Sequence, residues 1–373
     1  MNNSIAEKYT GNIHKGGRVI GMKVTVLGGG NTGCVMAAEF SLRGFEVTLF
    51  EERQFWNEHI DGILDNGNVV TVKGNDVVGD AYIPHITSDL GTAVADAEAI
   101  FISMVAWRHD GLIEELAPLL HNGQRVIFSA GNFASIKLRK RLGNNHPAIV
   151  GEMMGNIFPC RMVGPHTAVI AAQLSEKMVA AFPATDTGRL IDVIGEVIPC
   201  TPAKTVFEAA LNAPNVVVHL AASLMNIANA EKDPHFGVYK DGLSPSVVHG
   251  IEMVEAEKKK VMDLMGYKSV VHSTHMKRVM TYDQFPELDM FRSLEGPNSV
   301  DHRYISEDAS CGDCLILSLA QRLDIEMPFL HALVTIASGL NGKDYLKTGI
   351  TMDSLGIPGS NPDEINAFLT NAQ

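Results

Sequence analysis

Three polar residues in the second half of the chain have the types needed for acid–base chemistry on an acidic substrate. His219 lies within the apolar segment "NVVVHLAASLMN", and Arg303 and Asp308 stand five positions apart in "GPNSVDHRYISED". A histidine is a general acid or base near neutral pH, and an aspartate on its ring N–H fixes its tautomer. An arginine binds a carboxylate through two parallel hydrogen bonds. The three residues therefore predict a proton-transferring site beside a carboxylate pocket.

The polar residues around His219 repeat at helical spacing. Asn212, Asn215, His219, Ser223 and Asn226 are separated by 3, 4, 4 and 3 positions, so they share one stripe of a helix. A helix that is otherwise apolar is buried on nearly all sides, and its polar stripe faces either a cleft or an internal hydrogen-bond network. We interpret His219 as a cleft-facing acid or base, with a hydrogen-bonded core histidine as the alternative. Asn215, one turn before it, is a candidate substrate contact.

The first half of the chain carries the glycines of a dinucleotide-binding turn. In "VTVLGGGNTGCVMAAEF", Gly28, Gly30 and Gly33 follow a predicted strand and open a predicted helix. Glycines are needed there because the backbone must approach a pyrophosphate closely, and the helix amides bind the phosphates. Asn31 and Thr32 complete the turn and are expected to bind the cofactor with the glycines.

Residues after the next strand bear on the choice of cofactor. Glu51 stands 23 positions after Gly28, where an acid accepts hydrogen bonds from the adenosine ribose and repels a 2′-phosphate, which favours NAD. Arg53 would instead bind a 2′-phosphate, so NADP is the alternative. Arg108, in the later loop "AWRH", is a candidate for holding a substrate carboxylate, and a solvated surface arginine is the other interpretation.

The order of the predicted elements divides the chain into two domains. Strands are predicted over residues 24–27, 47–50, 100–105 and 125–129, helices over 32–42, 110–120, 134–142 and 187–197, and antiparallel additions over 168–172 and 178–183. From about residue 204 only helical periodicity remains, over 214–230, 246–265 and 314–322. We therefore expect an N-terminal extension over 1–21, an α/β Rossmann domain with a doubly wound sheet over 22–203, and an all-helical substrate domain over 204–373.

The composition excludes several classes of partner. The chain has 30 Lys and Arg against 43 Asp and Glu, a net charge of −13, which disfavours nucleic acid and anionic membranes. No apolar run has the length of a membrane span and the N-terminus lacks a secretory signal, so a cytoplasmic location is expected. Five scattered cysteines indicate free thiols. Cys311 and Cys314 have no second cysteine pair at a suitable distance, so no metal is expected.

In these motifs the chain resembles the opine dehydrogenase family, of the octopine and N-(1-carboxyethyl)-norvaline dehydrogenase type. The resemblance covers the glycine turn, "NAPNVVVHLAASLMN", "SPSVVHGIEMVEAEKKKVMDLMG", "GPNSVDHRYISED" and "YLKTGITMDSLGI", in order from residue 22 onward. It implies a Rossmann domain that binds NAD(P)H and a helical second domain. It also implies reductive coupling of an amino acid to a 2-oxo acid such as pyruvate, with His219 as acid/base, Asp308 as its partner and Arg303 on a substrate carboxylate.

Two departures from the family pattern carry consequences. Leu220 follows the histidine where the family commonly has proline, and Asp313 lies in "GDCL" where the family tends to read "GLVP". A carboxylate there would favour a cationic amino acid. The alternatives to an opine enzyme are a dinucleotide-binding sensor without chemistry and a simple 2-oxo acid reductase. Related reductases usually carry a lysine in the equivalent helix, and residues 205–231 contain none. Self-association into a homodimer is expected on the helical half.

Overall fold

The computed structural model describes residues 21–74, 78–172 and 174–372, which form two compact units. The first unit ends at Ala203 and the second begins at Lys204, close to the point where the strand pattern of the sequence stops. The predicted extension over residues 1–21 lies outside the described residues, except for Gly21.

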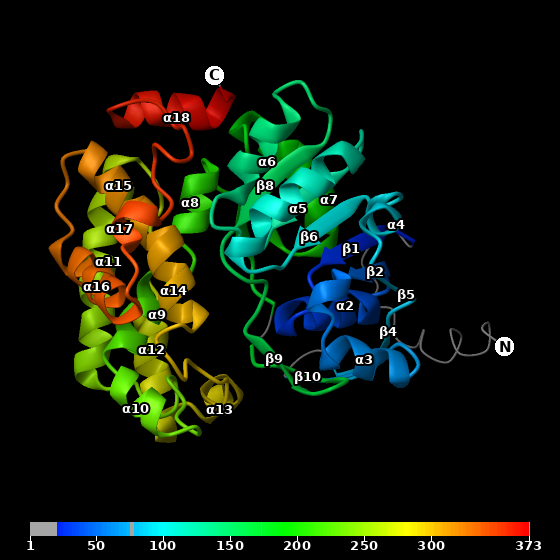
Figure 1. Cartoon of the computed structure of the whole chain (residues 1–373), viewed down its shortest axis with the longest axis horizontal. Coiled ribbons are helices and arrows are strands. Elements are labelled where there is room, and N and C mark those ends of the chain that lie inside the picture. The colour runs from blue at the N-terminus through cyan, green and yellow to red at the C-terminus, as the bar shows by residue number, and fades with distance from the viewer. Residues whose placement is uncertain (1–20, 75–77, 173, 373) are drawn as a thin grey trace. The chain divides into compact units, whose positions relative to one another are not determined.

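The first unit contains an eight-stranded sheet with the order β12-β11-β8-β7-β6-β1-β2-β5. Figure 1 shows its neighbouring strands β6, β1, β2 and β5. Its strands are β1 (Lys23–Leu27), β2 (Glu46–Phe50), β5 (His85–Thr87), β6 (Ala99–Ile102), β7 (Arg125–Phe128), β8 (Ile149–Met153), β11 (Lys177–Ala181) and β12 (Cys200–Pro202). The six neighbouring strands β8, β7, β6, β1, β2 and β5 run parallel to one another, in the order of a dinucleotide-binding sheet. The predicted Rossmann sheet is confirmed.

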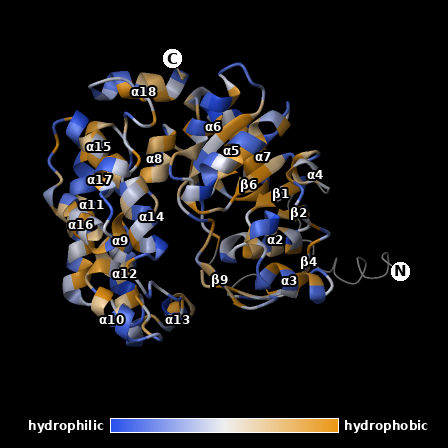
Figure 2. Ribbon diagram, in the orientation of Figure 1, coloured by the Kyte–Doolittle hydropathy of each residue, from blue (hydrophilic) through white to orange (hydrophobic). Residues whose placement is uncertain are grey.

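Helices cover this sheet because its central strands are apolar on both faces. They are α2 (Asn31–Leu42), α3 (Glu58–Asp65), α4 (Leu90–Val94), α5 (His109–Leu116), α6 (Ala134–Leu142) and α7 (Thr187–Val197), with short 3-10 turns at Arg53–Phe55, Ala106–Arg108, Ala117–Leu119 and Ala184–Asp186. Ala99 and Phe101 of β6 pack into one hydrophobic cluster, and Ile100 and Ile102 pack into the other. Figure 2 shows β1 and β6 as hydrophobic strands. A continuous apolar run is typical of a parallel strand buried on both sides.

A second, four-stranded sheet corrects one prediction. Its order is β4 (Gly79–Tyr82), β3 (Val69–Gly74), β10 (Thr167–Ile170) and β9 (Cys160–Gly164). The run predicted over 168–172 forms β10, which pairs antiparallel with β9 but parallel with β3, outside the main sheet. The run predicted over 178–183 does join the main sheet, antiparallel to β8. Alternating residue patterns identify strands but carry no information about their neighbours.

The second unit is helical throughout its described residues, 204–372, as predicted. Its helices are α8 (Val206–Leu211), α9 (Asn215–Leu224), α10 (Ile227–Lys232), α11 (Pro245–Leu264), α12 (Ser273–Met280), α13 (Asp289–Arg292), α14 (Arg303–Asp308), α15 (Cys314–Arg322), α16 (Pro328–Asn341), α17 (Tyr345–Thr348) and α18 (Pro362–Asn371). Short 3-10 turns lie at Tyr282–Gln284 and Pro286–Leu288, and a π-helical turn at Ala309–Asp313 joins α14 to α15. None of the helices described is long and apolar enough to cross a membrane.

The single helix predicted over residues 214–230 is wrong. The structure has two helices there, because α9 ends at Leu224 and α10 begins at Ile227. Between them, the Asn226 side chain donates to the carbonyl of Ala222 at 2.9 Å and to that of Gly242 at 3.0 Å. An asparagine that binds backbone carbonyls competes with helix hydrogen bonds. The apolar periodicity continues through this break and conceals it.

The glycine turn predicts a clear difference between two neighbouring substitutions. A Cβ on Gly33 would lie 1.7 Å from the Gly28 carbonyl oxygen, whereas a Cβ on Gly30 would meet nothing within 4 Å. Gly33→Ala should therefore lower the free energy of unfolding by about 3 kcal/mol through overpacking. Gly30→Ala, at a φ of −76°, should change it far less. Urea denaturation of the two variants measures both values, and equal losses would contradict this account of the turn.

The π-helical turn encloses an unusual carboxyl group. Asp313 is 0% exposed, and neither of its carboxyl oxygens has a hydrogen-bond partner. Burial raises the pKa of this carboxyl well above its usual range, and the nearby charge of Asp308 raises it further. The carboxylate that the sequence was expected to present to a substrate is therefore held inside the helical unit.

The Asp313 carboxyl binds its proton more tightly in the folded protein than in the unfolded chain. The free energy of unfolding should therefore fall as the pH rises above about 4, the pKa of an aspartate in the unfolded chain. Asp313→Asn removes the titration. The free energy of unfolding of the variant, relative to the native chain, should increase by about 1 kcal/mol or more between pH 5 and pH 8. Denaturant titrations at both pH values test this, and parallel pH profiles would contradict it.

Candidate functional site

The glycine turn of the first unit has the features of an anion site. Gly28 has a φ of 119°, and a Cβ there would lie 2.4 Å from the Ser103 carbonyl oxygen. Gly30 precedes α2, whose first turn has neither a side-chain cap nor an acidic residue. The amides at the start of α2, from Asn31 and Thr32 onward, therefore suit a phosphate. The Asn31 side chain accepts a hydrogen bond from the Met162 amide at 2.8 Å, which ties the turn to β9.

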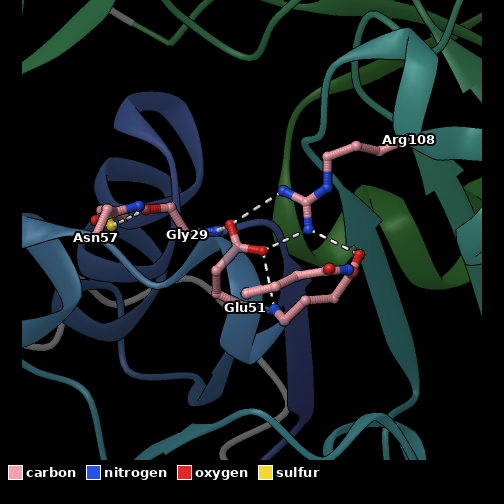
Figure 3. Close-up of polar contacts among 7 residues, drawn as sticks. Gly29, Glu51, Asn57 and Arg108 are labelled. Carbon is pink, nitrogen blue, oxygen red and sulfur yellow. Dashed lines mark hydrogen bonds and ion pairs between the residues drawn. The ribbon is translucent and has the colours of Figure 1, made fainter.

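Glu51 supports this turn from the end of β2 (Figure 3). Its carboxylate is 3% exposed and accepts hydrogen bonds from the amides of Gly29, at 2.8 Å, and Glu52, at 2.9 Å. The Gly29 carbonyl in turn accepts from the Asn57 side chain at 3.0 Å. Both backbone polar groups of Gly29, its N–H and its C=O, are thus hydrogen-bonded to side chains. The structure places Glu51 next to the turn, as the spacing in the sequence predicts.

Arg108 is bound to Glu51, which the sequence did not indicate. Its Nη2 lies 2.5 Å from Glu51 Oε1 and 2.8 Å from Glu52 Oε1, and its Nη1 lies 3.3 Å from Glu51 Oε2. The guanidinium carbon lies 3.9 Å from the centre of the Phe55 ring. This position corrects the expectation of a substrate carboxylate at Arg108, because the guanidinium already binds two protein carboxylates. Arg53, the residue predicted to bind a 2′-phosphate, is exposed and lies over the Trp56 ring.

A strained loop follows β7 at the carboxyl edge of the sheet, where Rossmann proteins bind their cofactors. Ala130, Asn132 and Phe133 have positive φ values of 55°, 50° and 69°. Beneath them, the buried Glu152 accepts a hydrogen bond from the Ser135 amide at 2.9 Å, and burial raises the pKa of Glu152 to about 7. Strained backbone of this kind collects at ligand sites. We therefore add this loop to the candidate cofactor site, although its sequence carries no recognised motif.

In the second unit, α9 and α14 pack together and bring the predicted acid–base residues into contact. His219 Nδ1 lies 2.7 Å from Asp308 Oδ2. Asn215, one helical turn before His219, donates to Asp308 Oδ1 at 2.8 Å. The histidine side chain is 15% exposed and the aspartate 7%. Both oxygens of Asp308 are therefore engaged, and the carboxylate is oriented towards the imidazole.

Two tyrosines that the sequence analysis missed complete the surroundings of His219. The Tyr239 hydroxyl lies 3.1 Å from His219 Nε2, and the Tyr304 ring stacks on the imidazole with centres 3.6 Å apart. Burial raises the pKa of Tyr239 well above its usual range, so this hydroxyl stays protonated and donates to Nε2. His219 then carries its proton on Nδ1, facing Asp308. Tyr304 directly follows Arg303 in the sequence, whereas the segment around Tyr239 has no periodic pattern.

Arg303 begins α14 and lies next to Tyr304, the tyrosine that stacks on His219. Its guanidinium carbon is 5.3 Å from the centre of the Tyr304 ring. Within the part of the chain that is described, no hydrogen bond or ion pair engages this guanidinium, and the residue is partly exposed. Asp308 ends α14, and the helix continues through the π-helical turn, so the side chains of Asn215 and His219 contact its carboxylate.

The ends of the predicted polar stripe do not face the acid–base residues. The Asn212 side chain is fully buried and donates to the carbonyls of Glu208 and Lys268, at 2.9 and 2.8 Å. Asn226 is likewise bound to backbone carbonyls, at the break after α9. Helical spacing placed Asn212 and Asn226 on the same stripe as His219. In the structure, their side chains instead bind backbone carbonyls of neighbouring segments.

The cysteines have separate surroundings. Cys314 Sγ donates to the Tyr345 carbonyl at 3.1 Å, and Cys311 Sγ lies 3.7 Å from the Ser310 hydroxyl. Over the described ranges there is no group of three or more His, Cys, Asp or Glu residues arranged to hold a metal ion.

Comparison with known proteins identifies relatives over nearly the whole chain. The family described as NAD/NADP octopine/nopaline dehydrogenase, alpha-helical domain, matches residues 202–341. The opine dehydrogenase of Arthrobacter sp. (strain 1C) is 30% identical over 345 residues, which cover 90% of this chain and 95% of that protein. The vitopine synthase of Allorhizobium ampelinum is 24% identical, covering 92% of this chain and 98% of that protein.

The fold leads to the same group of proteins. A solved structure of octopine dehydrogenase in complex with NADH and agmatine has a TM-score of 0.67 at 17% identity, covering 94% of this chain and 98% of that one. The identity to the Arthrobacter protein extends through both the Rossmann unit and the helical unit. The chain therefore belongs to the opine dehydrogenase family, a family of NAD- or NADP-dependent oxidoreductases.

Proposed function

We propose that this protein catalyses the NAD(P)H-dependent reductive condensation of an amino acid with a 2-oxo acid. The observation that carries the proposal is the 2.7 Å contact of His219 with Asp308, beside an arginine, Arg303, that no described carboxylate engages. Solved structures of octopine dehydrogenase hold NADH with L-arginine, with agmatine and with pyruvate. Of those ligands, L-arginine is an amino acid and pyruvate a 2-oxo acid, the two substrate classes proposed here, and agmatine is the amine that lacks the carboxylate of arginine.

The first unit fits the cofactor. The open space at Gly30 and the uncapped start of α2 suit a pyrophosphate, which needs backbone amides and no intervening side chain. When bound, the reduced nicotinamide supplies the hydride that converts an imine into a secondary amine.

In the second unit, His219 would move the protons. Bound substrate would take the place of the Tyr239 hydroxyl at Nε2. As the amine nitrogen attacks the carbonyl carbon of the 2-oxo acid, Nε2 then accepts a proton from that nitrogen while Asp308 stabilises the imidazolium. The imidazolium then returns this proton to the alkoxide, which gives the carbinolamine. A second proton, taken up from solvent by the imidazole, is passed to the hydroxyl, which leaves as water while the nitrogen lone pair forms an iminium. Asn215 and Tyr239 would act as positioning residues, because their hydrogen bonds to Asp308 and to Nε2 hold the imidazole in this tautomer.

Arg303 would bind the carboxylate of one substrate. A guanidinium presents two parallel N–H groups to a carboxylate. Its neighbour Tyr304 stacks on His219, so the bound carboxylate would lie near the imidazole.

Free cysteine thiols support a cytoplasmic location for the reaction.

The reaction itself is tested with a matrix of amino acids and 2-oxo acids, each with NADH and NADPH, by following the absorbance of the reduced cofactor. We expect turnover only when both an amine and a 2-oxo acid are present, with a secondary amine as product by mass spectrometry. Rapid reduction of the 2-oxo acid alone would instead indicate a simple reductase. Tight cofactor binding without turnover for any pair would indicate a sensor.

His219→Ala should lower kcat by at least about 100-fold while leaving the affinity for the reduced cofactor unchanged, because a positioned acid/base is lost. His249→Ala is the matched control, since His249 is an exposed histidine of α11 whose side chain is 70% accessible. Steady-state kinetics and a fluorescence titration of cofactor binding provide the two readouts. Undiminished turnover in His219→Ala would assign His219 a purely structural role.

A further inference from the structure

The carboxylate that usually receives the adenosine ribose is fully occupied in this protein. Glu51 Oε2 accepts hydrogen bonds from the Gly29 amide at 2.8 Å and from Arg108 Nη1 at 3.3 Å. Glu51 Oε1 accepts from the Glu52 amide at 2.9 Å and from Arg108 Nη2 at 2.5 Å. A carboxylate offers about four acceptor sites. While Arg108 is in place, Glu51 has no acceptor site left for a ribose hydroxyl.

Arg108 reaches this carboxylate from a different part of the sheet. It ends the 3-10 turn Ala106–Arg108 after β6, whereas Glu51 follows β2. Figure 3 shows its guanidinium bonded to Glu51. Glu52 and the Phe55 ring also contact the guanidinium, and the Arg108 side chain is 9% exposed. Arg108 and Glu51 therefore form a buried ion pair next to the glycine turn, not a surface ion pair.

The pairing changes the charge that a cofactor meets at the end of β2. An unpaired acid at this position repels a 2′-phosphate and so selects NAD over NADP. Here the Arg108 guanidinium lies 2.5 Å from Glu51 and 2.8 Å from Glu52, so its positive charge offsets one of the two negative charges at this position. Glu51 therefore does not predict exclusion of NADPH, as the sequence pattern alone would.

We propose that Arg108 sets the choice between NADH and NADPH, because its pairing with Glu51 weakens the repulsion that a 2′-phosphate meets there. The proposal rests on the cofactor part of the proposed function, a dinucleotide bound at the Gly28–Gly33 turn. It does not depend on which amino acid or 2-oxo acid is the substrate.

The test measures binding alone, with NADH and NADPH titrated separately against each variant. The two tryptophans of the chain, Trp56 and Trp107, provide the signal. Trp107 packs edge-on against Phe55 with ring centres 5.5 Å apart, and Arg108 stacks on that same Phe55 ring. Quenching of tryptophan emission should therefore report dinucleotide bound near this pair.

Arg108→Met leaves Glu51 charged and unpaired, so the ratio of the NADPH Kd to the NADH Kd should rise about tenfold or more. Arg108→Lys keeps the positive charge and should hold the ratio within about threefold of the native value. Arg141→Met is the matched control, because Arg141 is 47% exposed and pairs with Glu114 away from this turn. NADH binding to each variant shows whether the site is folded.

An unchanged or lowered ratio in Arg108→Met would overturn the proposal, as would equal weakening of both cofactors. If neither cofactor binds the native chain, the proposed function and this inference both fail. If both bind but no substrate pair turns over, the proposed reaction fails while the role of Arg108 is still decided by the ratio.

Discussion

A buried carboxylate is costly unless its oxygens accept hydrogen bonds, and each unit of this protein contains one that meets the condition at its candidate site. In the Rossmann unit, Glu51 accepts from two backbone amides and from Arg108. In the helical unit, Asp308 accepts from Asn215 and His219. These contacts fix the glycine turn in one case and the orientation of an imidazole in the other, so the chemistry proposed for each unit depends on them.

Two other buried carboxyl groups show what happens when the condition is not met. Glu152 has one oxygen without a partner and Asp313 has two, and burial raises the pKa of both. Asp313 lies in the π-helical turn immediately after the helix that ends at Asp308. Turns of this type are frequent at functional sites. The helical unit thus leaves the buried carboxyl group of Asp313 without hydrogen bonds close to the His219–Asp308 pair. Departures of this kind from normal hydrogen bonding are typical of functional sites.

The sequence predicted much of the fold and many of the site residues. Apolar β-branched runs and helical periodicity identified the Rossmann sheet and the helical second unit, because both patterns are local. Gly28, Gly30 and Gly33 were recognisable because a missing side chain at fixed spacing has few other uses. The single helix predicted through Asn226 is divided in the structure, where the Asn226 side chain binds two backbone carbonyls. The run predicted as an antiparallel addition, β10, also pairs parallel with β3, because strand partners are distant in sequence.

The sequence by itself determined which residue types were available: a histidine in an apolar helix, an Arg-x-x-x-x-Asp segment and an acid after the second strand. Only the tertiary structure decided which of them meet. Asp308 reaches His219 across 89 positions of the chain, and Arg108 reaches Glu51 across 57. The physical reason is that hydrogen bonds and ion pairs act over about 3 Å in space, whereas sequence spacing constrains only neighbours on one helix or strand.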